Sequence, residues 1–197
     1  LGKLTMLKEI EFGLASERKW FYPGYILDKD SSFDYKLKLG NMEYYTPAKR
    51  WAKIEKFNPD NTIGHDVRSS TQKLIHALEK EKIPNKPWLY PYFSMGYMGP
   101  WNAYFMRSPA PIELGHDLGG MMVTAYSTEE KAYSLFRIHP CPDGPQFLNL
   151  EASKEFSNSE EYLNHLYQIG DVILEHGTIE VLLDQIRTWR KKPNYLP

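Results

Sequence analysis

The sequence lacks most of the features that assign a chemical function at once. One cysteine, Cys141, stands among 197 residues, so no internal disulfide can form, and this usage fits a reducing compartment. The 24 basic and 25 acidic residues leave a net charge of −1, which argues against nucleic acid as a partner because that binding depends on clustered Lys and Arg. No apolar run of about 18 residues is present, so we expect no transmembrane segment.

The common motifs of nucleotide binding and catalysis are also missing. The sequence contains no GxxxxGK[ST], GxGxxG, HExxH or GxSxG pattern. Cys141 lies between two prolines, and its spacing from His139 does not ensure the contact that an activated thiol needs. We therefore expect no cofactor, no catalytic residue of these classes, and a protein that binds rather than catalyses.

Six histidines keep one catalytic alternative open. The tripeptide Gly-His-Asp occurs at 64–66 and at 115–117, and adjacent His and Asp can supply two metal ligands. Both pairs follow a glycine in expected loops, whereas a Glu-x-x-His pair converges on a metal mainly when it lies on a helix. The alternative is a metal-dependent hydrolase with the ligands Glu113, His116, Asp117 and His139.

The hydrophobic pattern predicts an α+β fold with a central antiparallel sheet flanked by helices. Apolar spacing and capping residues predict helices at 4–18, from Thr46-Pro47 to about 58, at 69–82, from Ser157 to about 167, and from Thr178 to about 190. Alternation predicts strands at 33–39 and 132–138, and short or β-type runs predict strands at 42–45, 101–106, 121–126 and 147–150. We expect 1–70 to form helices and a short hairpin packed on an α+β domain of residues 71–197, as one compact unit.

A long aromatic, proline-rich loop precedes the central strands. Residues 84–111 hold six prolines, two tryptophans, four tyrosines and two phenylalanines. The prolines disfavour a helix, and the large aromatic rings, which stabilise packing, argue against disorder. The loop either wraps over the core or forms a partner-binding surface, since Tyr, Trp and Met are frequent interface anchors. The partner-binding candidates are Trp88, Tyr90, Tyr92, Phe93, Tyr97, Trp101 and, beyond the loop, Asp117.

The order of these segments resembles a known superfamily. Pro111-Ile112, the loop 115–120 and a strand–turn–strand to Ile138 are followed by the helix-like EFSNSEEYL at 155–163. Together with LEKEKIPNKPWLYPY at 78–92, this pattern resembles the SMI1/KNR4 (SUKH) superfamily over about residues 74–168. The resemblance implies an α+β fold with an antiparallel sheet and a protein-binding role, either in bacterial immunity proteins that bind toxins or in eukaryotic scaffolding and regulatory subunits.

The sequence therefore predicts a non-enzymatic protein-interaction module. It would be an immunity-type binder or an accessory or scaffold subunit of a larger complex, and its partner would be another protein, a toxin or the subunits of that assembly. The expected location is the cytoplasm. Because the chain starts at Leu1 rather than Met, a mitochondrial location after removal of a presequence is the alternative. The metal-dependent hydrolase with His116 and Asp117 stays the alternative function.

Overall fold

The computed structural model describes residues 2–28, 31–97, 104–141 and 160–191. The chain divides into two compact units, an N-terminal unit of residues 1–66 and a C-terminal unit of residues 67–197. Within the described residues, no helix is long and apolar enough to cross a bilayer. The chain belongs to the α+β class, as the sequence predicts.

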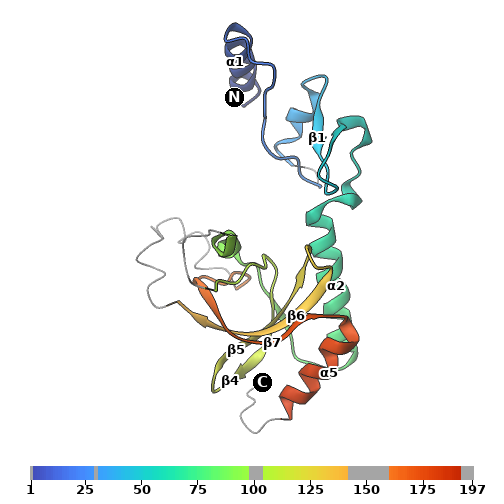
Figure 1. Ribbon diagram of the computed structural model, residues 1–197, viewed down its shortest axis with the longest axis vertical. Helices are drawn as coiled ribbons and strands as arrows, with labels where there is room; N and C mark the ends of the chain where they lie inside the picture. Colours follow the sequence, from blue (N-terminus) through green and yellow to red (C-terminus); the bar gives the residue numbers. More distant parts are fainter. Residues whose placement is uncertain (1, 29–30, 98–103, 142–159, 192–197) are drawn as a thin grey trace. The chain divides into compact units, whose positions relative to one another are not determined.

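An antiparallel sheet of five strands forms the centre of the C-terminal unit (Figure 1). Its order is β3 (Lys86–Pro87), β4 (Ile112–Asp117), β5 (Gly120–Ser127), β6 (Ala132–Pro140) and β7 (Tyr167–Gly177). Strands β5 and β6 lie where the sequence predicts them, joined by the expected polar turn. A tight turn at Leu118-Gly119 joins β4 to β5 and brings Asp117 opposite Gly120.

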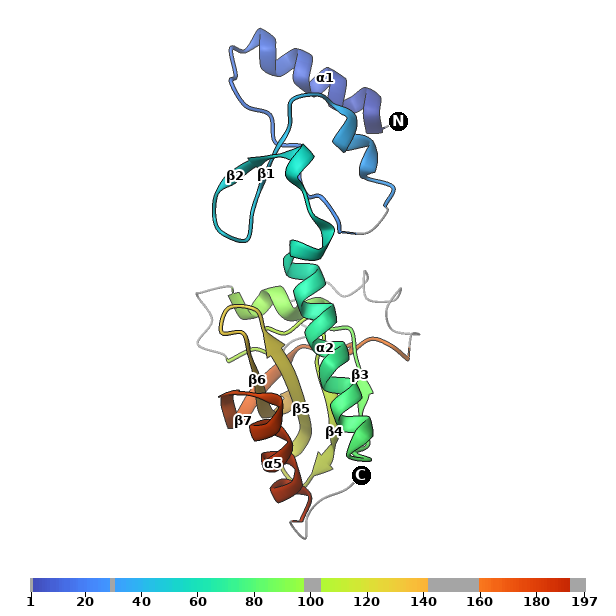
Figure 2. The ribbon, with the colours of Figure 1, turned by 90° about the vertical axis from the view of Figure 1, so that its right-hand side faces the viewer.

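Two helices, α2 (Ile63–Lys80) and α5 (Ile179–Arg190), lie side by side on one face of this sheet (Figure 2). Leu74 and Leu78 of α2 and Leu182 and Ile186 of α5 are almost fully buried there against the strands. Helix α5 begins where the sequence predicts, because the Thr178 side chain accepts a hydrogen bond from a first-turn backbone N–H. This face holds the larger part of the core.

The opposite face of the sheet is covered by irregular segments rather than by α-helices within the described residues. The 3₁₀-helix η4 (Pro91–Tyr97), the residues around Met106 and those from 160 to 167 lie over it. Their buried side chains pack on the inward residues of β5 and β6 and form a second cluster: Tyr90, Met106, Val123, Ala125, Phe136, Ile138, Leu163 and Tyr167. The proline-rich segment is therefore a structural cover for the sheet over most of its described length.

The N-terminal unit contains short elements. They are α1 (Gly2–Ala15), η1 (Asp34–Lys38), β1 (Glu43–Tyr45), β2 (Trp51–Lys53), η2 (Ile54–Lys56) and η3 (Pro59–Asn61). Strands β1 and β2 form an antiparallel hairpin in which Tyr45 pairs with Trp51 and Glu43 with Lys53. Helix α1 and strand β1 confirm the helix predicted at 4–18 and the strand predicted at 42–45.

Two predictions for the N-terminal unit are wrong, and local side-chain hydrogen bonds explain both. Residues 33–39 form η1 instead of a strand, because the Asp34 carboxylate accepts hydrogen bonds from the Ser31 backbone and hydroxyl at 3.1 and 2.9 Å. Thr46-Pro47 opens a hairpin turn instead of a helix. The Thr46 hydroxyl donates to the Arg50 carbonyl at 2.9 Å, and Lys49 takes a positive φ of 56°.

Further corrections concern helix boundaries. Helix α2 begins at Ile63 rather than at 69, because Thr62 accepts the His65 backbone N–H at 3.1 Å and acts as its cap. His65 and Asp66 are therefore helical, not in a loop. The helix predicted up to about 167 is absent from 160 onward. There the backbone bonds to other segments, with the Leu163 N–H donating to the Leu89 carbonyl, and β7 begins at Tyr167.

The remaining predicted strands are only partly described. Of the strand predicted at 101–106, Phe105 forms a single bridge to Gln168, and residues 101–103 lie outside the described residues. The strand predicted at 147–150 and the helix cap predicted at Ser157 also lie outside them. The proline spacing in 84–111 is compatible with the 3₁₀ turns of η4, although it disfavours an α-helix.

Candidate functional site

The aromatic segment before β4 places most of its predicted binding residues against the sheet. Tyr90 is 1% exposed, and its hydroxyl accepts the Tyr167 backbone N–H at 3.0 Å. Burial raises the pKa of Tyr90 to about 12. Tyr92 packs edge-on against Tyr90, with ring centroids 6.1 Å apart. Tyr90 is thus a core residue whose ring offers no surface to a partner.

Trp88 is half-buried and belongs to a small polar cluster. Its indole N–H donates to Glu113 Oε2 at 2.7 Å, and the Lys86 ammonium lies 3.8 Å from the centre of its ring. Phe93 and Tyr97 keep 37% and 56% of their surface exposed. Trp101 lies outside the described residues. Only the outer rings of this segment remain accessible, so it offers a small surface.

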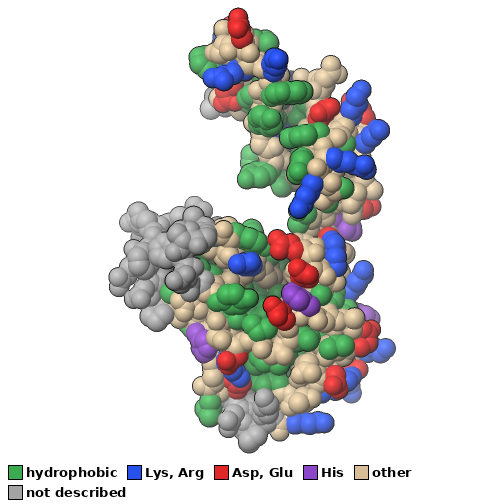
Figure 3. Space-filling view, viewed as in Figure 1, with side chains coloured by type: hydrophobic (Ala, Val, Ile, Leu, Met, Phe, Trp, Pro, Cys, Tyr) green, Lys and Arg blue, Asp and Glu red, His purple; other side chains and the backbone are tan. Residues whose placement is uncertain are grey.

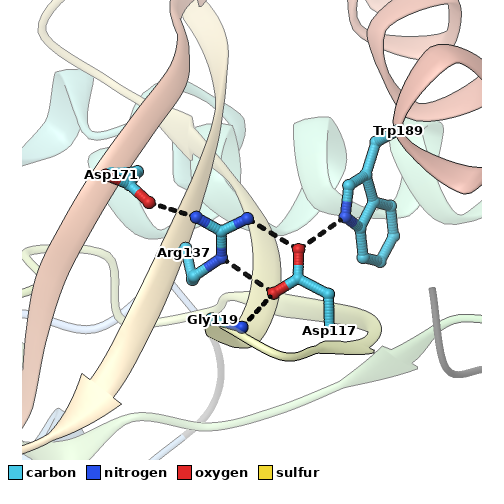
Figure 4. A network of polar contacts seen from close by, with 5 residues as sticks. All are labelled: Asp117, Gly119, Arg137, Asp171 and Trp189. Atoms are coloured by element: carbon cyan, nitrogen blue, oxygen red, sulfur yellow. Dashed lines mark hydrogen bonds and ion pairs between the residues drawn. The ribbon is translucent and has the colours of Figure 1, made fainter. Parts of the chain in front are cut away.

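Asp117 lies at the centre of a network that joins the sheet to α5 (Figure 4). Arg137 of β6 donates from Nε to Oδ1 at 2.9 Å and from Nη2 to Oδ2 at 2.6 Å, and it also binds Asp171 of β7. The Trp189 indole of α5 donates at 3.0 Å and the Gly119 N–H at 2.8 Å. The Arg137 hydrogen bond, helped by these donors against partial burial, lowers the pKa of Asp117 to about 2.

The four alternative metal ligands do not form a metal site. Glu113 and His116 contact each other, with His116 Nε2 at 3.1 Å from Glu113 Oε1. The Asp117 oxygens are instead occupied by Arg137, Trp189 and a backbone N–H. Among the described residues, no group of three or more His, Cys, Asp or Glu side chains is placed to hold a metal ion. The arrangement therefore gives the hydrolase alternative no structural support.

A more prominent surface lies in the N-terminal unit, on one face of the β1–β2 hairpin. Cross-strand partners in a hairpin point to the same side, so the Tyr45 and Trp51 rings meet there with centroids 5.3 Å apart. Tyr22 also packs against Trp51, with ring centroids 6.1 Å apart. These three rings, Tyr22, Trp51 and Tyr45, form the aromatic row. The opposite side of the hairpin is packed internally, because Tyr44 contacts Phe57 at 5.3 Å.

The aromatic row is exposed in a unit that has almost no core. Tyr22, Trp51 and Tyr45 are 70%, 53% and 56% exposed. Met6 is the one buried residue among the described residues of 1–66. Hydrophobic side chains gather on the surface beside β1 (Figure 3), and the large ones that are more than a third exposed include Trp20, Phe21, Tyr25 and Leu27. A gathering of exposed apolar side chains of this kind is typical of an interaction site.

The aromatic row borders a cleft of about 1710 Å³ whose lining residues all lie between Ile10 and Gly64. Ligand pockets for small molecules usually measure about 300–1,000 Å³, so this cleft has the size for a polypeptide segment. Its charged lining residues are balanced: Lys19, Lys49 and Lys53 against Asp28, Glu43 and Glu55. The cleft therefore offers aromatic surface without a net field of either sign.

Sequence reasoning missed this surface. The signal was present in WFYPGY at 20–25 and in YYTPAKRW at 44–51, which are richer in aromatic residues than the segment 84–111 and each contain one proline. The helix predicted from Thr46-Pro47 placed Trp51 on a helical face, and the pairing of Tyr45 with Trp51 depends on the hairpin turn instead. No family model, curated protein or solved structure matches the chain, so the resemblance to the SUKH superfamily stays a prediction.

Proposed function

We propose that this chain is a non-enzymatic protein-interaction module that serves as an accessory subunit and docks through the cleft of its N-terminal unit. The observation that carries the proposal is the contrast between the two units. The C-terminal unit buries two hydrophobic clusters on its sheet, whereas the described part of the N-terminal unit buries one side chain and exposes its aromatic rings. A segment with so little core of its own gains stability chiefly from surface supplied by another molecule.

The magnitude of the exposed surface supports docking. Aromatic side chains bury about 150–250 Å² each when fully covered. At the exposures of the aromatic row, covering a further ~100 Å² per ring is worth about 2–3 kcal/mol at about 25 cal/mol per Å². Three rings of this kind match the few aromatic anchors that dominate most interfaces. Phe93 and Tyr97 of η4 offer a smaller second surface.

Site-specific photo-crosslinking in the native source tests the proposal. A photoreactive benzoylphenylalanine replaces Tyr45 in the cleft or, as the matched control, Phe93 on η4. We expect the Tyr45 position to crosslink to one other polypeptide and the Phe93 position not to do so. The mass of the crosslinked peptide identifies that polypeptide as a toxin, which makes the module an immunity-type binder, or as a subunit of a larger assembly.

Two double variants then measure the energetic contribution of each surface. Tyr22→Ala with Trp51→Ala should weaken the isolated complex by about 2 kcal/mol or more, a factor of about 30 in Kd. Phe93→Ala with Tyr97→Ala should leave it within about twofold. Crosslinks from Tyr45 only to residues 67–197 of the same chain, or crosslinks from Phe93 alone, would show that the cleft is not the docking surface.

A further inference from the structure

We infer that the aromatic row binds an uncharged, proline-rich segment of the partner in an extended conformation. This inference rests on the proposed docking function and adds the chemistry of the bound segment. Three features of the cleft point to it: the arrangement of the rings, the hydrogen-bond donors that they carry, and the balance of charges around them.

The rings of the aromatic row contact one another and keep much of their surface exposed. Trp51 is tilted by 51° from Tyr22 and by 59° from Tyr45, with centroids 6.1 and 5.3 Å apart. Rings arranged in this way leave exposed faces on which a flat proline ring can pack. Grooves lined by aromatic rings are the usual binding sites for polyproline II segments, whose fixed φ lowers the conformational cost of binding.

The same side chains supply the donors that such a segment needs. A polyproline II helix has no internal hydrogen bonds, so its carbonyl groups remain available as acceptors. Within the described residues, the hydroxyl groups of Tyr22 and Tyr45 and the indole N–H of Trp51 make no hydrogen bond to the protein. Each ring can therefore contact proline with its face and donate to a neighbouring carbonyl from its edge.

The charges around the row select against other ligands. Three lysines and three carboxylates among the lining residues cancel, so neither a strongly acidic or basic peptide nor a nucleic-acid backbone finds a complementary field. The Glu43–Lys53 pair follows the Tyr45–Trp51 pair on the same hairpin face, two residues along each strand. These charges interrupt the apolar surface, whereas an amphipathic helix needs a continuous stripe over several turns.

Nuclear magnetic resonance of the full-length chain with decaproline tests the inference. The five tryptophan indole N–H signals are assigned by single Trp→Phe variants, and decaproline is compared with an alanine-rich helical peptide and with a thymidine decanucleotide. We expect decaproline to shift the Trp51 signal saturably. In titration calorimetry, which does not need the Trp51 signal, Trp51→Ala should weaken binding about tenfold or more and Tyr45→Phe, which keeps the ring, about threefold, whereas Phe93→Ala should change it less than twofold.

The outcomes separate this inference from the proposed function. If decaproline leaves the Trp51 signal unchanged, or binds equally well to Trp51→Ala and to Tyr45→Phe, the proline-rich ligand is refuted, while crosslinks from position 45 still support docking. Tighter binding of the helical peptide or of the decanucleotide also refutes it. Finally, sedimentation velocity is measured at rising protein concentration. Self-association that Trp51→Ala abolishes would instead show that the cleft binds a second copy of this chain.

Discussion

Replacing Asp117 by Asn removes the negative charge that joins the end of β4 to β6 and α5. The Asp117 side chain is 9% exposed and faces Arg137, which is 17% exposed. After the replacement, Arg137 keeps its contact with Asp171, which is 64% exposed. The substitution therefore weakens the network at its least solvated position, and Asp171→Asn is the matched control at its most solvated one.

The pKa of Asp117 sets the size of the effect. A fall from the ordinary value of 3.8 to about 2 corresponds to roughly 2.5 kcal/mol at about 1.4 kcal/mol per pKa unit. Because solvent reaches the Arg137–Asp171 side of the network and screens it, we expect about 1–2 kcal/mol of unfolding free energy to be lost at pH 7. Asp171→Asn should cost less than about 1 kcal/mol, as exposed ion pairs do.

Urea denaturation followed by circular dichroism measures both variants as a function of pH. The folded-state pKa of Asp117 is depressed, so its stabilising contribution is present above the unfolded value and disappears as the pH falls towards about 2. The gap between wild type and Asp117→Asn should therefore close between about pH 5 and pH 2. A gap that stays constant over this range, or that is no larger than the one for Asp171→Asn, would refute the electrostatic account.

Substitutions at three other positions test parts of the C-terminal unit by urea denaturation. Tyr90→Phe leaves the buried Tyr167 N–H without its acceptor and should cost about 1–3 kcal/mol; no loss would show that water replaces the hydroxyl. Gly120→Ala should cost about 1–3 kcal/mol or more, because φ is +131° and a Cβ would lie 2.7 Å from the Ile138 carbonyl oxygen; a neutral result would contradict this turn geometry. Thr178→Ala should cost about 0.5–1 kcal/mol through loss of the α5 cap, whereas Thr178→Ser should retain most of the stability.

The parts of the fold that the sequence predicts are those whose signals are local. The β-type run 121–126 and the alternating run 132–138 predict β5 and β6, and the polar residues between them predict the turn. Thr178 predicts the start of α5, because its hydroxyl bonds within the first turn. In these cases the capping residue, the apolar spacing and the turn residues all lie within one short stretch of chain. The element can therefore be recognised without knowledge of its tertiary contacts.

Some of the missed elements depend on partners elsewhere in the chain. The helix predicted from Ser157 to about 167 rests on Leu163, Leu166 and Tyr167, whose spacing also suits a helical face. In the structure the Leu163 N–H donates to the Leu89 carbonyl, and the Leu166 carbonyl accepts the Cys141 N–H. Tyr167 begins β7 opposite Pro140 of β6. Similarly, Thr46-Pro47 suits both a helix start and a hairpin turn. The turn prevails where Tyr45 and Trp51 can pair across it.

The candidate site could not be located from residue type alone, because this chain uses aromatic, proline-bearing segments in two opposite ways. In 84–111, the rings of Tyr90 and Tyr92 find the open face of a sheet in their own unit and become part of its core. In the N-terminal unit, Trp51 projects from a two-stranded hairpin, Tyr22 of the preceding segment packs against it, and both rings remain more than half exposed. Aromatic density therefore indicates a surface that must be covered, and only the fold shows whether the chain itself covers it. For the aromatic row, the described residues of the N-terminal unit leave the rings exposed, and the proposed docking function follows from that exposure.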